Sequence, residues 1–262
     1  MMRGNDNSDS NAAFQLNDIR VAFALLTRLP LPYPPFDAKR PAAMAAWAYP
    51  LVGVGVALLM ILTVWGAMAF GLPAQIAALL ALLTALLTTG AMHEDGLADC
   101  ADGFWGGWTP EQRLEIMKDS QIGTYGVLGL LVSFGVRWQA VVLLIETEAL
   151  VALFTVAVLS RAAMVWMMHL LPNARRTGLS EQTGRPTDVT VYAALGIGAA
   201  SAVLSVGAAA IILVMLVGAV TFALSKMARS KIGGQTGDVL GATQQVVECV
   251  LLITLVALVH NS

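Results

Sequence analysis

Long apolar stretches with at most one charged side chain recur along the chain and restrict its fold more than any other feature. A helix needs about 20 apolar residues to cross the hydrocarbon core of a bilayer. The sequence is 57% hydrophobic and only 12% charged, which is outside the usual range of soluble domains. We therefore expect an all-α fold, a polytopic membrane helix bundle with about seven transmembrane helices. The predicted spans are 44–70, 74–92, 124–145, 149–171, 189–206, 208–225 and 243–260.

The stretch 189–225 allows two interpretations: two short spans joined by a Gly-rich hairpin near Gly207, or one very long helix. In short loops of membrane proteins, Lys and Arg remain on the cytoplasmic side. With two spans, thirteen of the fifteen lysines and arginines fall on one face of the membrane, whereas a single span divides them. This distribution favours two spans, a cytoplasmic N-terminus and a chain that ends outside a bacterial inner membrane.

Two basic side chains, Arg137 and Arg161, lie inside predicted spans. An ion within the membrane is costly and is by default a candidate for a functional site. For Arg137 we favour a snorkelling side chain or a structural pair. For Arg161 a functional and a structural role stay equally open.

The region ahead of the first span divides into two parts. Residues 1–13 are polar and are expected to form a disordered tail, with no cleaved signal peptide, and 14–262 are expected to form one integral-membrane catalytic domain. The segment that begins at Phe14 mixes apolar and polar residues before several prolines. This pattern predicts an amphipathic helix that lies at the membrane interface.

The stretch "HEDGLADCADG" (93–103) places acidic residues directly after an uncharged span. If it continues as helix, Asp95, Asp99 and Asp102 share one face, because they are four and three residues apart. Clustered carboxylates repel one another, so either water hydrates them in a solvated loop or a divalent cation neutralises them. We favour the cation, Mg²⁺ with Mn²⁺ as a substitute, because all the donors are oxygens.

A zinc site is a weaker alternative for the same stretch. His93 and Cys100 are seven residues apart and have no second pair of ligands nearby in the sequence. Cys100 and Cys249 are expected to be free thiols.

Two further stretches reach the same membrane face in the predicted topology. "EIMKDSQIGTYG" (115–126) carries Lys118 and Asp119 at the start of the third span. "KIGGQTGDVLGA" (231–242) is a Gly-rich turn with Thr236 and then Asp238 at the start of the last span. Because a Gly-rich turn that leads into a helix can bind phosphate through its backbone N–H groups, a phosphate-bearing substrate is expected.

These motifs, in this order, resemble the cobalamin synthase family, the adenosylcobinamide-GDP ribazoletransferases. The resemblance covers most of the chain. Its most specific parts are the acidic block and "IMKDSQIGTYG". The matching stretches are "TRLP" (27–30), "YPLVG" (49–53), "HEDGLADCADGFWG" (93–106), "RLEIMKDSQIGTYG" (113–126), "SR" (160–161) and "GGQTGD" (233–238).

The resemblance implies an Mg²⁺-dependent reaction at the membrane. A ribose hydroxyl of α-ribazole, or of its 5′-phosphate, attacks the corrinoid-side phosphorus of adenosylcobinamide-GDP, and GMP leaves. Asp95, Asp99 and Asp102 are the expected catalytic residues and metal ligands, with Asp102 preferred as the proton acceptor by analogy with other membrane phospho-alcohol transferases. Asp119 and Asp238 complete or orient the metal shell. The expected substrate- and phosphate-binding residues are Arg113, Lys118, Arg161, Gly234, Thr236 and Gly237.

Two positions depart from the family pattern. Glu94 stands where the pattern is usually apolar, and its direction on the helix, about 100° from Asp95, argues against a role as a metal ligand. Lys118 stands where an arginine is usual, and lysine meets a phosphate without the bidentate fork.

Two other functions are weighed against this one. A CDP-alcohol phosphatidyltransferase also uses aspartates on membrane helices, but its signature requires Ala-Arg where this chain has Asp99 and Cys100. A divalent cation transporter would carry its acids near the membrane midplane. No nucleic acid partner is expected, since the net charge is −2. A homo-oligomer and contacts with other late cobamide-assembly enzymes remain open.

Overall fold

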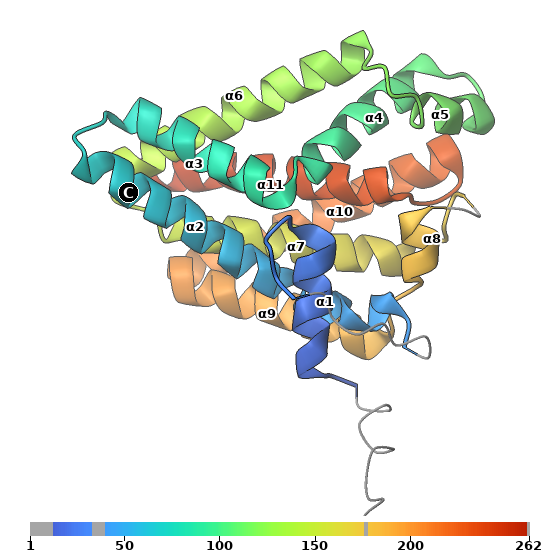
Figure 1. Cartoon of the computed structure of the whole chain (residues 1–262), viewed down its shortest axis with the longest axis horizontal. Helices are drawn as coiled ribbons and strands as arrows, with labels where there is room; N and C mark the ends of the chain where they lie inside the picture. The colour runs from blue at the N-terminus through green and yellow to red at the C-terminus, as the bar shows by residue number, and fades with distance from the viewer. Residues whose placement is uncertain (1–12, 33–39, 176–177, 261–262) are drawn as a thin grey trace, which may run out of the picture.

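The computed structural model describes residues 13–32, 40–175 and 178–260, and in these ranges helices are the only extended regular structure (Figure 1). The all-α prediction is confirmed. Asn173 and Gln235 form one isolated parallel bridge between two loops. The α-helices are α1 (Leu16–Leu26), α2 (Tyr49–Ala69), α3 (Ala74–Thr89), α4 (Met92–Gly106), α5 (Pro110–Ile116), α6 (Thr124–Glu146), α7 (Ala152–Leu170), α8 (Leu179–Thr183), α9 (Asp188–Val206), α10 (Ala210–Ile232) and α11 (Gly237–His260). Two 3₁₀ helices, η2 (Ala42–Ala48) and η3 (Gly207–Ala209), precede α2 and α10.

Several of these helices are long and apolar enough to cross a bilayer, so the protein is an integral membrane protein. In the described ranges, five stretches qualify: Ala42–Ala69, Thr124–Glu146, Ala152–Leu170, Asp188–Ile232 and Gly237–Val259. The pair α3 and α4 makes a sixth if a span bent by 87° is counted as one. The predicted number of seven is therefore not confirmed by this count.

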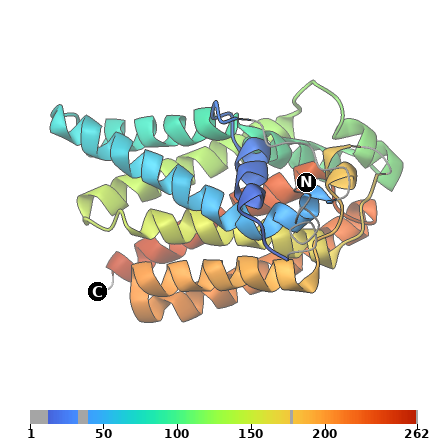
Figure 2. The same cartoon turned by 60° about the horizontal axis from the view of Figure 1, so that its bottom comes forward.

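The stretch Asp188–Ile232 is 45 residues long, which would give a straight helix of about 68 Å. It is broken at Gly207, whose φ of 57° and ψ of −131° are not helical. Both outer ends return to the end of α7: Asp188 lies 3.3 Å from His169, and Arg229 donates to the carbonyl oxygen of Leu170. The helices α9 and α10 thus pack side by side as a hairpin, as the two-span interpretation of 189–225 expects (Figure 2).

Helix α7 is the centre of the bundle. It packs against α2, α9, α10 and α11, and most of its side chains are buried. The approach of α2 depends on Gly53, because a Cβ atom there would lie 2.3 Å from the carbonyl oxygen of Ala157. Small residues at such crossings are typical of membrane helix packing, where close contact replaces the hydrophobic effect.

Helix α1 forms where the interfacial helix was expected and lies across η2 and α2 (Figure 1). The buried carboxylate of Asp18 holds it there: it accepts hydrogen bonds from the Arg40 guanidinium at 2.8 Å and from Trp47 Nε1 at 2.8 Å. Its position on a membrane leaflet stays a prediction. Residues 1–12 of the expected tail lie outside the described ranges.

Candidate active site

A sharp turn between α3 and α4 separates the acidic helix α4 from the apolar helix that precedes it. Gly90 and Ala91 both have left-handed backbone angles, with φ of 67° and 55°. This conformation is uncommon for a residue with a side chain such as Ala91. The turn bends the chain by 87° and directs α4 along α11 and α6 (Figure 1). The acidic residues consequently face the ends of other helices.

A close approach between α4 and α11 gathers the carboxylates. A Cβ atom on Gly96 would stand 2.7 Å from the carbonyl oxygen of Asp238, so only glycine allows this contact. Asp238 thereby comes close enough to interact electrostatically with Asp95 and Asp99. The predicted clustering of Asp95 and Asp99 with Asp238 is thus present in the structure, and it concentrates negative charge at one place.

A cavity of about 180 Å³ opens beside this cluster. It is formed where four segments meet: the start of α4, the loop after α7, the helix α8 and the turn between α10 and α11. Asp95 and Asp238 contribute carboxylates, and Arg175 contributes a guanidinium. The other lining residues are Met92, Asn173, Gly178, Ser180, Glu181, Gln235, Thr236 and Gly237. The cavity therefore offers acidic, basic and neutral polar groups together.

Arg175 is the functional candidate that the sequence did not single out. Its Nη1 lies 3.5 Å from Asp238 Oδ2, and its Nη2 donates to the carbonyl oxygen of Leu114 at 2.8 Å. Its Nε is buried without a hydrogen-bond partner among the described residues. In the sequence, Arg175 is only one of the thirteen lysines and arginines that the predicted topology places on one face of the membrane. A planar guanidinium at this place suits a phosphate group.

The Gly-rich turn before α11 has a structural role in addition to its predicted contact with phosphate. Gly234 lets it pack against the loop after α7, since a Cβ atom there would lie 2.3 Å from the carbonyl oxygen of Pro172. Thr236 directly precedes α11: its hydroxyl accepts from Val239 N at 3.3 Å and donates to Asp238 at 3.1 Å. Thr236 and Gly237 line the cavity, so they remain candidates for phosphate contact.

Asp102 lies on the same acidic face but is directed toward α6. Its two carboxylate oxygens accept hydrogen bonds from the backbone N–H groups of Gly123 at 2.7 Å and Gly126 at 2.9 Å. These groups belong to the beginning of α6, where backbone donors lack partners within the helix. Asp102 therefore anchors α6 to α4. Its predicted part in metal binding and proton transfer is not tested by this contact and stays a prediction.

Three other predicted residues lie on or near α5. The guanidinium of Arg113 donates to the carbonyl oxygens of Gly107 at 3.0 Å and Lys231 at 2.9 Å, which ties the end of α4 to α10. Lys118 and Asp119 are exposed, and Asp119 accepts from the backbone N–H of Gln121 at 3.0 Å. These three side chains are not among the residues that line the cavity described above. Their predicted contacts with phosphate or metal remain untested.

Arg161 and Arg137 occupy a second, buried pocket inside the bundle. Arg161 donates to the carbonyl oxygen of Ala157 at 2.9 Å, and its predicted phosphate contact is not tested there. Arg137 forms an ion pair with Glu94 at 2.9 Å, so the interpretation of Arg137 as part of a structural pair is confirmed. Both cysteines are free, as expected.

The donors at the cavity suit magnesium in kind. In the described ranges, no group of three or more His, Cys, Asp or Glu side chains is arranged to hold a metal ion by itself. Mg²⁺ usually keeps several waters and takes one or two carboxylates together with substrate phosphates, rather than a closed protein cage. Asp95 and Asp238, beside a cavity that can admit a phosphate, are compatible with such a shared site. The assignment of Mg²⁺ stays a prediction.

Fold and site together define a class of protein: an all-helical integral membrane protein with a polar, acid-rich cavity where several helices begin and end. Comparison with known proteins gives the family. The family model described as cobalamin-5-phosphate synthase matches residues 18–256. The chain belongs to this family, and the resemblance noted in the sequence is confirmed.

Curated relatives cover nearly the whole chain. A protein named adenosylcobinamide-GDP ribazoletransferase from Bradyrhizobium diazoefficiens is 42% identical over 245 residues, which is 92% of this chain and 93% of the relative. A protein of the same name from Mesorhizobium japonicum is 42% identical over 93% of this chain and 94% of its own length. A protein of the same name from Brucella canis is 40% identical over 92% of this chain and 96% of its own length. No solved structure matches the chain.

Proposed function

We propose that this protein is a transferase of cobalamin biosynthesis that joins adenosylcobinamide-GDP to α-ribazole, or to its 5′-phosphate, and releases GMP. The family and the names of its relatives support this activity. The structural observation that carries the proposal is the cavity in which Asp95 and Asp238 lie beside Arg175. Such a site can receive a diphosphate and a hydroxyl nucleophile together.

In the proposed reaction, the ribose oxygen forms a bond to the corrinoid-side phosphorus, and the bond from that phosphorus to the oxygen of GMP breaks. In phosphoryl transfer an enzyme mainly positions the reactants and stabilises their negative charge. Arg175 would contact the diphosphate through its guanidinium, and the start of α11 at Gly237 would offer backbone N–H groups. Mg²⁺ bound at the carboxylates would neutralise charge on the diphosphate.

The proton of the attacking hydroxyl requires a nearby base. Asp95 is exposed at the cavity and Asp99 is half-buried one helical turn further along α4. Asp102 already accepts two backbone N–H groups. We therefore assign the proton acceptor to Asp95 or Asp99 instead of Asp102. A positioned base of this kind accelerates a reaction by roughly 10²–10⁴-fold.

We further propose that the cavity faces the cytoplasm. The loop that carries Arg175, the end of α10 with Arg229 and Lys231, and α5 all lie at the same end of the bundle as the cavity. Since basic loops remain on the cytoplasmic side, this end would be cytoplasmic, and both substrates would reach it from there.

The test is a reaction with the purified protein in detergent or nanodiscs, supplied with adenosylcobinamide-GDP, α-ribazole and Mg²⁺. GMP and a complete cobamide should appear in equal amounts. Asp95→Ala and Asp99→Ala should abolish GMP release while the protein still inserts in the membrane.

Asp188→Asn is a matched control, because it removes an exposed carboxylate at the start of α9, and it should leave GMP release unchanged. The absence of GMP with the unaltered protein would overturn the proposed activity. Near-normal turnover of either alanine variant would overturn the assignment of the site.

A further inference from the structure

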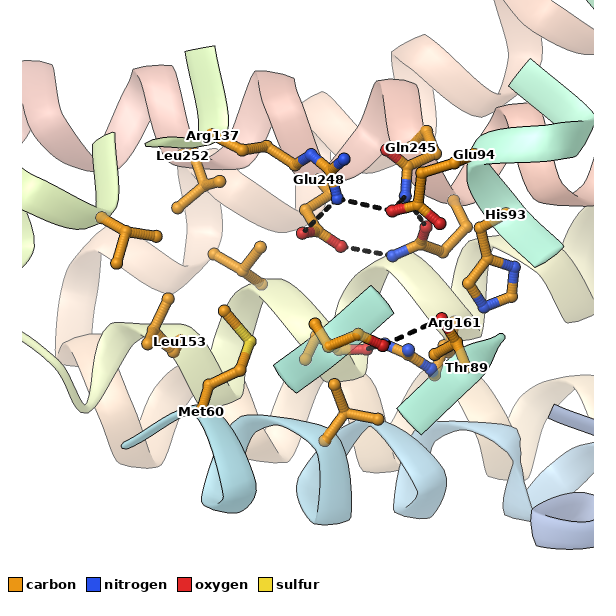
Figure 3. A pocket seen from close by; sticks show the side chains of 16 residues that line it. Met60, Thr89, His93, Glu94, Arg137, Leu153, Arg161, Gln245, Glu248 and Leu252 are labelled. Carbon is orange, nitrogen blue, oxygen red and sulfur yellow. Dashed lines mark hydrogen bonds and ion pairs between the residues drawn. The ribbon is translucent and has the colours of Figure 1, made fainter. Parts of the chain in front are cut away.

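A second pocket inside the bundle, separate from the cavity beside Asp95, holds a group of charged and polar side chains (Figure 3). Two arginines and two glutamates form its charged part: Arg137 on α6, Arg161 on α7, Glu94 on α4 and Glu248 on α11. We call these four residues the buried quartet. Arg137 and Arg161 are 3% and 2% exposed. The formal charges of the quartet balance, as the cost of burying ions requires.

Within the quartet, the link between α4 and α6 is the shortest ion pair. Arg137 Nη1 lies 2.9 Å from Glu94 Oε1 and 3.7 Å from Glu248 Oε1. Gln245 of α11 donates a second hydrogen bond to the same Glu94 oxygen at 3.1 Å. Glu94 is thus held by two helices at once, as Figure 3 shows.

Glu94 is the residue immediately before Asp95. Two successive residues of a helix point about 100° apart, so fixing the direction of Glu94 also fixes the direction of Asp95. Asp99 lies one turn further along the same helix. A rotation of α4 about its axis would therefore move these carboxylates relative to Asp238 and the cavity, and it would break the pair with Arg137.

We propose that Glu94 is a positioning residue: its buried contacts with Arg137 and Gln245 fix the rotation of α4 and so direct the catalytic carboxylates toward the cavity. This inference rests on the proposed function for its effect on turnover. Its structural part is independent, because it concerns the orientation of α4 alone. The supporting groups around a reactive site commonly contribute 10–100-fold to affinity or activity.

The accessibility of Cys100 to a thiol reagent reports on the position of α4. It lies on this helix and is buried, and Cys249 is the other cysteine of the chain. In a Cys249→Ser background, the rate at which a small membrane-permeant thiol reagent alkylates Cys100 reports on movement of α4. The rate can be measured whether or not the protein is active.

The experiment compares Glu94→Leu with the matched control Glu248→Leu. Each variant removes one carboxylate from the buried quartet and leaves the same excess of positive charge, but only the first breaks the ion pair between α4 and α6. We expect Glu94→Leu to raise the alkylation rate of Cys100 at least tenfold and to lower kcat for GMP release by about 10–100-fold. Glu248→Leu should change the alkylation rate and kcat by less than about threefold each. Glu94→Gln keeps a hydrogen bond to Arg137, so its effects should lie between those of Glu94→Leu and Glu248→Leu.

Several outcomes would overturn the proposal. Equal effects of Glu94→Leu and Glu248→Leu would show that charge balance alone matters. Unchanged alkylation of Cys100 in Glu94→Leu would show that α4 does not depend on this contact, whatever happens to turnover. If Glu94→Leu fails to insert, the same comparison is made between Glu94→Gln and Glu248→Gln, with equal effects again counting against the proposal. A lack of GMP release by the unaltered protein would contradict the proposed function and leave the alkylation result to decide the role of Glu94.

Discussion

Gly96 of α4 lies directly against the backbone of Asp238 at the start of α11, and a Cβ atom at position 96 would stand 2.7 Å from the Asp238 carbonyl oxygen. The contact places carboxylates of two helices, about 140 residues apart in sequence, at one cavity. The obstacle is backbone, which cannot rotate away as a flexible side chain could. The distance between these helices is therefore set by the absence of a side chain at this position.

Gly96→Ala should separate α4 from α11 and reduce turnover. A displacement of about 1 Å in a reactive site can cost on the order of 10²-fold in rate, so we expect kcat for GMP release to fall by about 10–100-fold. Gly66→Ala in α2 is the control, because its added methyl group would meet no other atom within 4 Å. Full activity of Gly96→Ala would show that the spacing of these helices does not matter for the reaction.

Arg175 is expected to contact the diphosphate. Arg175→Leu should raise KM for adenosylcobinamide-GDP by tenfold or more, because charge-assisted hydrogen bonds contribute about 1.5–3 kcal/mol each. Arg175→Lys keeps the charge but loses the fork, and it should recover only part of the affinity. Arg20→Leu removes an exposed arginine of α1 and should have no effect on KM. An unchanged KM in Arg175→Leu would leave this arginine with a structural role only.

Asp102 is expected to stabilise the start of α6. Asp102→Ala leaves the backbone N–H groups of Gly123 and Gly126 without their acceptor, which should cost about 1–3 kcal/mol of stability. The midpoint of thermal denaturation in detergent should fall accordingly. Asp102→Asn, which retains one carbonyl oxygen as an acceptor, should fall less. Identical midpoints for the alanine variant and the unaltered protein would contradict this role.

The helical spacing of the acids was sufficient to predict a shared face for Asp95, Asp99 and Asp102, because the period of a helix is a local property. The uncharged apolar run predicted a second span that continues to residue 92, whereas α3 ends at Thr89. The difference arises from the left-handed turn at Gly90 and Ala91. Alanine gives no sequence signal for that conformation, so the direction of α4 could not be predicted.

Contacts between distant segments explain the remaining differences. Arg175 reaches the cavity because the loop after α7 pairs with the turn before α11 through Asn173 and Gln235. Glu94 pairs with an arginine 43 residues later. In the sequence, Arg175 is one of several basic loop residues, and Glu94 is a departure from the family pattern. The sequence identified two arginines within the spans, Arg137 and Arg161, but only the packing of α4, α6 and α11 shows which side chains are the partners of Arg137.

Removal of divalent metal is expected to abolish the reaction. A diphosphate beside several carboxylates meets repulsion that a bound divalent cation relieves, and Asp95 and Asp238 would supply oxygen ligands of the kind that Mg²⁺ prefers. Treatment with a chelator should stop GMP release, and added Mg²⁺ or Mn²⁺ should restore it, whereas Zn²⁺ should not, since it favours nitrogen and sulfur ligands. Asp238→Asn should raise the Mg²⁺ concentration that gives half-maximal activity by about tenfold, because one of the charged ligands is lost. Asp188→Asn should require the same Mg²⁺ concentration as the unaltered protein, since its carboxylate lies at the start of α9. GMP release that persists at full rate in the presence of chelator would mean that Arg175 and the helix N-terminus alone neutralise the diphosphate, and that the carboxylates serve the reaction without a metal.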